Sequence, residues 1–170
     1  MLIRRLVESD ADQFQALRLR GLAEEQIAFA SSYEEEVDRL IADVQAQLAF
    51  TDSGAIFGGF DEDRLVGVVG LQRESMKKLA HKGYIWGMYI SPEARGNNSG
   101  TQLLEAALAY AWSDLALAQV NLGVHTENAA AIKVYTSLGF KVFCTERGAL
   151  RVNGQNQDEH HMVCTAPSAA

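Results

Sequence analysis

The sequence has 170 residues, of which 48% are hydrophobic and 22% are charged, so it is long enough to form one domain with a substantial core. Its formal net charge of −7 argues against a nucleic-acid partner; it suits a cationic substrate such as an amine, although a solubilising surface explains it equally well. The N-terminus lacks the apolar core of a signal peptide, and no run approaches the roughly 18 apolar residues that span a bilayer. Cys144 and Cys164 are expected to be reduced thiols. We therefore expect a cytoplasmic protein that does not bind membranes.

The first third of the chain predicts one strand and two helices. A short strand is expected over residues 2–7, followed by a helix for which Asp10 is a candidate cap. A second helix is predicted over about 33–48, because Ser32 and Glu35 have capping-box spacing and apolar residues recur at helical intervals.

From residue 54 the pattern changes to strands alternating with helices. A hairpin, a polar connection over 74–83 and a strand buried on both faces over 84–90 come first. The later elements are a helix over 101–112, a strand over 120–124, a helix over 128–138 and strands over 140–145 and 159–164. The order β-α-α-β-β-β-α-β-α-β-β predicts an α/β fold with a mixed, twisted sheet of about seven strands and helices on both faces. We expect one domain over residues 1–170, with a disordered tail over 166–170.

A loop of small and polar residues separates the buried strand from the helix that follows it. Such a loop leaves backbone N–H groups free at the positive end of the helix dipole, which suits a phosphate or pyrophosphate. The chain is therefore predicted to bind a phosphorylated cofactor here. The loop residues are Arg95, Gly96, Asn97, Asn98, Ser99 and Gly100.

Two motifs resemble those of the Gcn5-related N-acetyltransferase (GNAT) superfamily. The main motif of that family is a strand, then Arg/Gln-x-x-Gly-x-Gly/Ala, then a helix, and residues 88–100 are similar to it. A second family element appears over 128–135, followed by Leu138-Gly139-Phe140. The element order also matches over residues 1–165, so the chain is identified as a member of this superfamily, with its acyl-CoA N-acyltransferase fold.

The resemblance implies acetyl-CoA or another acyl-CoA as the donor, and no metal. It implies that the loop amides hold the pyrophosphate, that the backbone of the preceding strand binds the pantetheine arm, and that Asn128 contacts the cofactor. The cofactor-binding residues implied in this way are Met88, Tyr89, Ile90, Arg95, Gly96, Asn97, Asn98, Ser99, Gly100 and Asn128.

The resemblance also places Tyr135 near the cofactor sulfur. An amine attacks a thioester directly, so the enzyme contributes positioning, a donor for the oxyanion and stabilisation of the thiolate. Proton transfer from an ordinary tyrosine, with a pKa of about 10, to a thiolate, with a pKa of about 8.5, is uphill by about 2 kcal/mol. Tyr135 is therefore expected to act as a hydrogen-bonding acid, the alternative being a core aromatic residue.

Two departures from the family pattern matter. Asn98 replaces the first motif glycine. Asparagine tolerates a positive φ, so the turn can be kept. Its side chain, however, stands where the diphosphate meets the bare backbone of the glycine in other family members. Tyr84 stands where the histone-modifying branch has a glutamate base. Glu74 and His81 are candidate bases, the alternative being solvated loop residues, and His125 either lines the acceptor pocket or is a satisfied residue at a strand end.

These residues predict an N-acetyltransferase that acts on a primary amine of a small molecule or peptide. A non-catalytic, CoA-binding or regulatory module is the alternative, which Asn98 and the missing glutamate keep open. The acceptor pocket is expected between the first helices and the last strands, with residues 22–36 and 146–158 setting specificity.

Adjacent His160 and His161 on a strand point to opposite faces and cannot easily share a metal ion. Edge strands near the C-terminus could pair in a homodimer.

Overall fold

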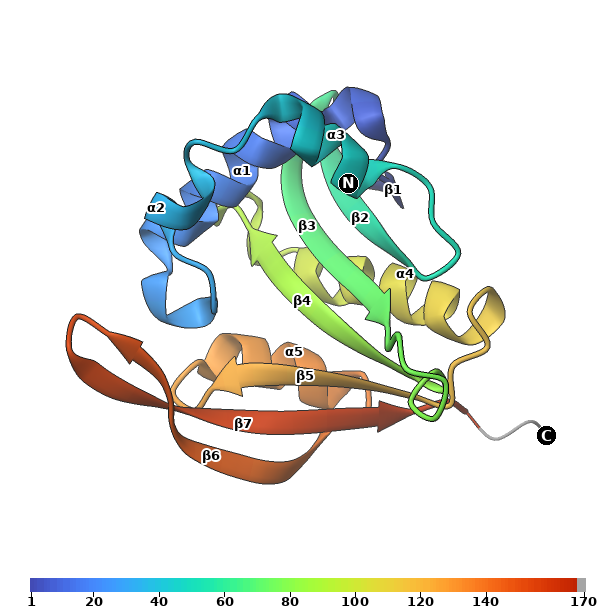
Figure 1. Cartoon of the computed structure of the whole chain (residues 1–170), viewed down its shortest axis with the longest axis vertical. Helices are drawn as coiled ribbons and strands as arrows, with labels where there is room; N and C mark the ends of the chain where they lie inside the picture. Colours follow the sequence, from blue (N-terminus) through green and yellow to red (C-terminus); the bar gives the residue numbers. More distant parts are fainter. Residues whose placement is uncertain (168–170) are drawn as a thin grey trace.

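Seven strands form one mixed sheet in the computed structural model, which describes residues 1–167 (Figure 1). The strands lie in the order β1-β2-β3-β4-β5-β7-β6, and all neighbours are antiparallel except β4 and β5. The strands are β1 (Leu2–Arg5), β2 (Gly54–Asp61), β3 (Arg64–Arg73), β4 (Lys82–Ile90), β5 (Gln119–His125), β6 (Lys141–Val152) and β7 (Gln155–Thr165). The mixed α/β sheet and the predicted order of elements are confirmed.

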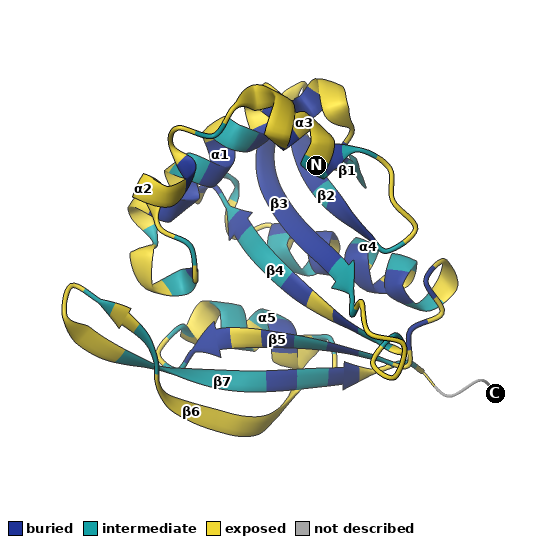
Figure 2. Ribbon diagram, viewed as in Figure 1, coloured by how far each residue is buried: buried dark blue, intermediate teal, exposed yellow. Residues whose placement is uncertain are grey.

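Helices cover both faces of the sheet. The helices are α1 (Ala11–Glu24), α2 (Tyr33–Glu36), α3 (Ile41–Leu48), α4 (Ser99–Ser113) and α5 (Ala129–Ser137), and the 3-10 turns are η1 (Glu8–Asp10), η2 (Gln26–Ala28) and η3 (Pro92–Ala94). In β3 the apolar side chains alternate between two cores: Val69 and Leu71 pack towards α4 and α5, whereas Val68 packs towards α1 and α3. Most of β3 is accordingly coloured as buried in Figure 2. None of the helices within residues 1–167 has the length and apolar character to cross a membrane.

The two central strands, β4 and β5, diverge soon after they meet. Their parallel pairing joins only residues 82–84 to residues 119–121, and beyond this point the ribbons separate (Figure 1). The β3–β4 register also shifts at a bulge, where Gly87 takes a φ of +62° that suits glycine. The prediction that β4 is buried on both faces is therefore wrong: Trp86 and Met88 are only half-buried, because no strand covers the free edge.

The second predicted helix is divided into two. Helix α2 ends at Glu36 and α3 begins at Ile41, because Leu40 takes an extended backbone conformation with ψ of 138°. The helical spacing of apolar residues suggested one buried face, but two of these residues face solvent: Leu40 is 70% exposed and Ile41 is 41% exposed. The capping box between Ser32 and Glu35 is confirmed, and it stabilises only the single turn of α2.

Helix α1 begins without the predicted side-chain cap. The Asp10 carboxylate instead accepts two hydrogen bonds of 2.7 Å from Arg4 and one of 2.9 Å from the Val7 amide. A bidentate arginine is a stronger partner than a helix amide, and it ties β1 to the start of α1.

The last two strands are longer than predicted and meet in a tight hairpin. Residues 146–158, expected as a connection, belong largely to β6 and β7, which join through Asn153-Gly154. Both turn residues have positive φ angles, 49° and 79°, which is the requirement of a two-residue Asn-Gly hairpin turn. Of the predicted tail, the Ala166 amide donates to Ala118 O at 2.9 Å, and residues 168–170 lie outside the described residues.

Candidate active site

A cleft of about 510 Å³ opens where β4 and β5 diverge. The end of β4, the loop before α4, the end of β5 and one side of α5 form its walls, and residues 25–29 around η2 close one end. Every predicted cofactor-binding residue except Asn97 lines this cleft, and so does Tyr135. The binding roles of these residues remain predictions.

The start of α4 presents free amides to the cleft. The Gln102 amide donates to Asn98 O at 2.9 Å, so the amides of residues 99–101 precede the helical ladder. Asn98 adopts the left-handed conformation, with φ of 57° and ψ of 17°, and Ser99 Oγ donates to Ala94 O at 2.7 Å. Asparagine therefore preserves the turn that glycine makes in the family motif, and the loop fits a pyrophosphate.

The helix and the strand approach each other closely beside this loop. A Cβ at Gly100 would lie 3.3 Å from Met88 Cε, so glycine lets α4 pack tightly against β4. Arg95 crosses the same end of the cleft: its Nε donates to Ile90 O at 2.9 Å, and its Nη2 lies 3.0 Å from Glu25 Oε1. One arginine thus joins the strand to the segment at η2.

Tyr135 is brought into the cleft by α5. The Asn128 side chain caps this helix by accepting from the Ala131 amide at 3.1 Å, as its position in the sequence suggests. The Tyr135 ring packs against Phe140, with ring centroids 5.9 Å apart. Burial raises the pKa of Tyr135 to about 12, because the charged phenolate is disfavoured away from water. The side chain is therefore a neutral donor at physiological pH.

The predicted bases, Glu74 and His81, do not line this cleft. Both precede the end of β4 that is paired with β5: the Glu74 amide donates to Lys82 O at 2.9 Å, and His81 O accepts from the Ala118 amide at 2.8 Å. The cleft lies at the other end of β4, where the strands have separated. Glu74 and His81 were chosen because they are near β4 in the sequence. That criterion failed because it does not show at which end β4 and β5 separate.

His125 lines the cleft, but both of its ring nitrogens have partners. Nδ1 accepts from the Glu127 amide at 3.3 Å, so Nε2 carries the proton and donates to Gln157 Oε1 at 2.9 Å. Both ring nitrogens are therefore engaged in hydrogen bonds within the protein. The expectation that His125 is satisfied at its strand end is confirmed; it also lines the cleft, and its place in an acceptor pocket stays a prediction.

Sequence reasoning missed Arg18 of α1. Its guanidinium is buried, bonds both carboxylate oxygens of Glu36 at 3.1 and 2.8 Å, and lies over the Phe29 ring at 4.8 Å. The free nitrogen, Nη1, faces the bulge in β4, 3.3 Å from where a Cβ at Gly87 would be. Burial opposes ionisation of Glu36, but the hydrogen bonds and charge of Arg18 outweigh it and hold the pKa of that carboxyl below its usual range. Arg18 thus ties α1 to α2, and its Nη1 is buried beside the bulge of β4 without a hydrogen-bond partner among the described residues.

The two histidines of β7 face different neighbours, as predicted. His160 Nδ1 lies 2.8 Å from Thr145 Oγ1, whereas His161 Nε2 lies 2.8 Å from Glu146 Oε2. Over residues 1–167, no three His, Cys, Asp or Glu side chains are arranged to hold a metal ion.

Comparisons with known proteins agree with this architecture. The model of the acetyltransferase (GNAT) family matches residues 18–140. An acetyltransferase of the GNAT family from Streptococcus pneumoniae superposes with a TM-score of 0.87 at 22% identity, covering 97% of this chain and 99% of that one. A putative acetyltransferase from Salmonella typhimurium, solved with its cofactor acetyl-CoA, gives a TM-score of 0.81 at 18% identity, covering 100% and 96%.

A further match is a phosphinothricin acetyltransferase of the GNAT superfamily from Sinorhizobium meliloti, in complex with acetyl-CoA. It gives a TM-score of 0.81 at 15% identity, covering 96% of this chain and 87% of that one. At these identities the structures establish the fold, and the family model, which spans most of the chain, establishes the family. Two motifs, the parted strands and the matching family model lead to one conclusion: the chain belongs to the acetyltransferase (GNAT) family, whose enzymes use acetyl-CoA.

Proposed function

We propose that this acetyltransferase transfers an acetyl group from acetyl-CoA to a primary amine of a small molecule or peptide, by direct attack within a ternary complex. One observation carries the proposal: the same cleft is lined by the free amides at the start of α4, by the edge of β4 that is not paired with β5, and by Tyr135, whose side chain is buried and carries a hydroxyl. The family favours this catalytic role over a binding-only module.

Different parts of the cleft suit different parts of acetyl-CoA. The amides of residues 99–101 would hold the pyrophosphate, where the helix dipole also favours negative charge. The backbone of β4 beyond Tyr84, which no strand pairs on the β5 side, would hydrogen-bond the pantetheine amides through residues 88–90. When bound, acetyl-CoA supplies a thioester carbonyl that an amine can attack. Arg95, which donates to Ile90 O, would give up this hydrogen bond and contact the cofactor instead.

Two groups in this chain would assist at the reacting atoms. A backbone N–H at the bulge of β4 would donate to the carbonyl oxygen, where negative charge develops. The Tyr135 hydroxyl would donate a hydrogen bond to the sulfur, stabilising the departing thiolate without fully protonating it.

The acceptor would enter between η2 and the tip of the β6–β7 hairpin. These two segments are neighbours in the structure: Asn153 Nδ2 of the hairpin tip lies 3.5 Å from Gln26 Oε1 of η2. They belong to residues 22–36 and 146–158, the ranges expected to set specificity. Exchanging either segment for that of another family member should change the preferred amine and leave acetyl-CoA binding in place. Loss of acetyl-CoA binding instead would show that the segment holds the donor.

A calorimetric titration with acetyl-CoA, with CoA and ATP as comparisons, tests the donor. We expect micromolar binding of acetyl-CoA and none of ATP. Release of CoA thiol in the presence of a panel of primary amines then tests the reaction. Binding without turnover on any amine would favour the non-catalytic module, and failure to bind any CoA compound would overturn the proposed function.

A further inference from the structure

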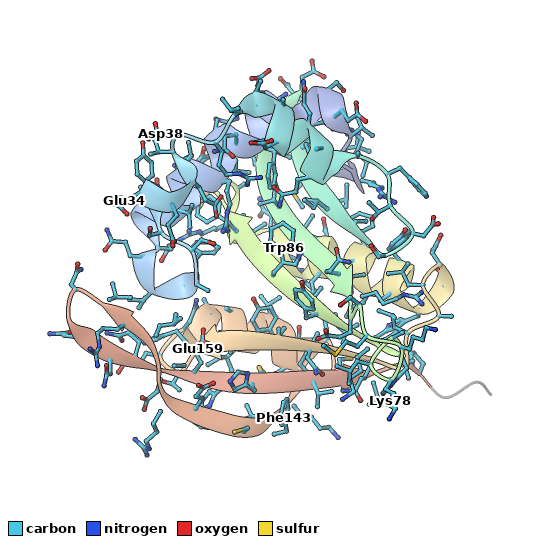
Figure 3. The ribbon with its side chains drawn as sticks, in the orientation of Figure 1. Glu34, Asp38, Lys78, Trp86, Phe143 and Glu159 are labelled. Atoms are coloured by element: carbon cyan, nitrogen blue, oxygen red, sulfur yellow. The ribbon has the colours of Figure 1, made fainter. Side chains whose placement is uncertain are left out.

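A carboxylate lies beside the cleft, opposite the helix that carries Tyr135. Glu159 of β7 is the Cα partner of His125 in β5, and its side chain lies over Gly123 of β5 (Figure 3). Glu159 Oε2 is only 3.3 Å from the position that a Cβ at Gly123 would occupy. Gly123 lines the cleft and is exposed, so the carboxylate stands at the rim of an accessible opening.

Glu159 differs from neighbouring acids because it has no partner within residues 1–167. Glu25 pairs with Arg95 at 3.0 Å, and Glu146, the Cα partner of Glu159 in β6, bonds His161 at 2.8 Å. Asp158, the preceding residue, accepts from the Gly148 amide at 2.8 Å and pairs with Arg147. A half-buried carboxylate without a hydrogen-bond donor is suited to a cation that arrives with the substrate.

None of the described groups that face Glu159 donates a hydrogen bond to its carboxylate. Both ring nitrogens of His125 already have other partners, Gln157 and the Glu127 amide, and the charge of Glu146 has the same sign as that of Glu159. His161, two residues along the same face of β7, already has Glu146 as its partner, with Nε2 2.8 Å from Glu146 Oε2. Among the described residues, Glu159 therefore stays without a partner above Gly123, where its charge can attract an ammonium group.

We propose that Glu159 binds the reacting amine of the acceptor as an ammonium ion, and that the acceptors are therefore strongly basic primary alkylamines. Before attack the bound ammonium gives one proton to water at the exposed opening above Gly123; the freed lone pair then forms the bond to the thioester carbonyl as the carbon–sulfur bond breaks, and CoA leaves as the thiolate. This inference rests on the proposed function. An alkylamine with a pKa of about 10.4 is cationic at neutral pH and gains a charge-assisted hydrogen bond from Glu159. A weakly basic aromatic amine is neutral: it can still donate an N–H to the carboxylate, but it lacks the attraction between opposite charges, so it gains less from Glu159.

The test compares two matched substitutions, Glu159→Gln and Glu146→Gln. Both remove one carboxylate from the same face of the hairpin and keep the shape of the side chain, but Glu146 already has His161 as its partner. The probes are n-butylamine and 4-methoxyaniline, with CoA release as the assay. Glu159→Gln should lower kcat/KM for n-butylamine by about 10- to 100-fold, mainly through KM, the loss expected for a hydrogen bond to a charged group. Glu146→Gln should change it by less than about twofold.

A third variant separates the position of the carboxylate from its charge. Gly123→Ala places a methyl group against Glu159 Oε2 and displaces the carboxylate while keeping its charge, so it should give an intermediate loss. In all three variants acetyl-CoA should bind as it does to the unaltered protein.

Equal losses in both Gln variants, or an equal loss with 4-methoxyaniline, would overturn the role of Glu159. An unaltered enzyme that binds acetyl-CoA but acetylates no alkylamine would also overturn it and leave the donor assignment standing. Failure of acetyl-CoA to bind would instead contradict the proposed function itself.

Discussion

The substitution Tyr135→Phe tests the chemistry of the cleft with the smallest change, because it removes only the hydroxyl. The pKa of Tyr135 is raised to about 12 by burial, whereas a thiol ordinarily has a pKa of about 8.5. The difference of about 3.5, at about 1.4 kcal/mol for each unit, makes full proton transfer to the thiolate uphill by about 5 kcal/mol. The buried environment thus strengthens the expectation drawn from an ordinary tyrosine.

A hydroxyl that keeps its proton stabilises the departing thiolate only through a hydrogen bond. Hydrogen bonds to charged groups contribute about 1.5–3 kcal/mol, so Tyr135→Phe should lower kcat by about 10- to 150-fold. Acetyl-CoA binding should change little, because the charge on sulfur develops only during the reaction. The assay is the rate of CoA release at saturating amine and acetyl-CoA, with calorimetry for binding.

Tyr110→Phe is the matched control. Tyr110 lies on α4, where its hydroxyl accepts from Arg5 at 3.2 Å, and it does not line the cleft. Its substitution should leave kcat unchanged. An unaltered kcat in Tyr135→Phe would refute the role of the hydroxyl, and a loss far above about 1,000-fold would refute the hydrogen-bonding role in favour of complete proton transfer.

Three further predictions concern the loop, the buried ion pair and acid stability. Asn98→Gly removes an exposed side chain from the loop and keeps the left-handed turn, so acetyl-CoA should bind up to about tenfold more tightly by calorimetry; equal Kd values would contradict this. Glu36→Gln leaves the buried Arg18 charge without its counterion and should lower the free energy of unfolding in urea by about 3–5 kcal/mol, whereas a loss below about 1 kcal/mol would show that the pair is not needed. The hydrogen bonds from Arg4 lower the pKa of Asp10, so the stabilisation is present above the ordinary carboxyl pKa and is lost as the pH falls through the lowered value. The difference in unfolding free energy between the unaltered protein and Asp10→Asn should therefore narrow from pH 7 to pH 3, and a constant difference would exclude this contribution.

Local signals in the sequence predicted most of the secondary structure and the donor half of the site. Asn98 was expected to take a positive φ and does so, and Asn128 begins α5 as a capping residue. Both depend on interactions within a few residues, which a sequence pattern can report. The Asn153-Gly154 turn was equally readable, since this pair favours a two-residue hairpin, but it was assigned to a connection.

The predicted helix over 33–48 failed for a different reason. Apolar residues recur there at helical intervals, yet Leu40 and Ile41 remain exposed and the helix is interrupted. Periodicity reports burial only when one face packs on the core, and the packing in this region is decided instead by the pair of Arg18 and Glu36. The two residues of this pair are 18 positions apart and lie on different helices, a separation at which sequence spacing carries no geometric information.

The residues proposed to bind the acceptor could be located only in the tertiary structure, although the sequence had pointed to residues 22–36 and 146–158. By itself the sequence determined an α/β chain with an acidic net charge, a loop predicted to bind an anion and a helix carrying Tyr135. Only the folded sheet decided that β4 and β5 part after three paired residues, that Glu74 and His81 lie away from the gap, and that Glu159 stands over Gly123. The physical reason is that loops and caps are stabilised by neighbours in the chain, whereas a cleft is formed by strands whose residues lie tens of positions apart and meet only when the sheet assembles.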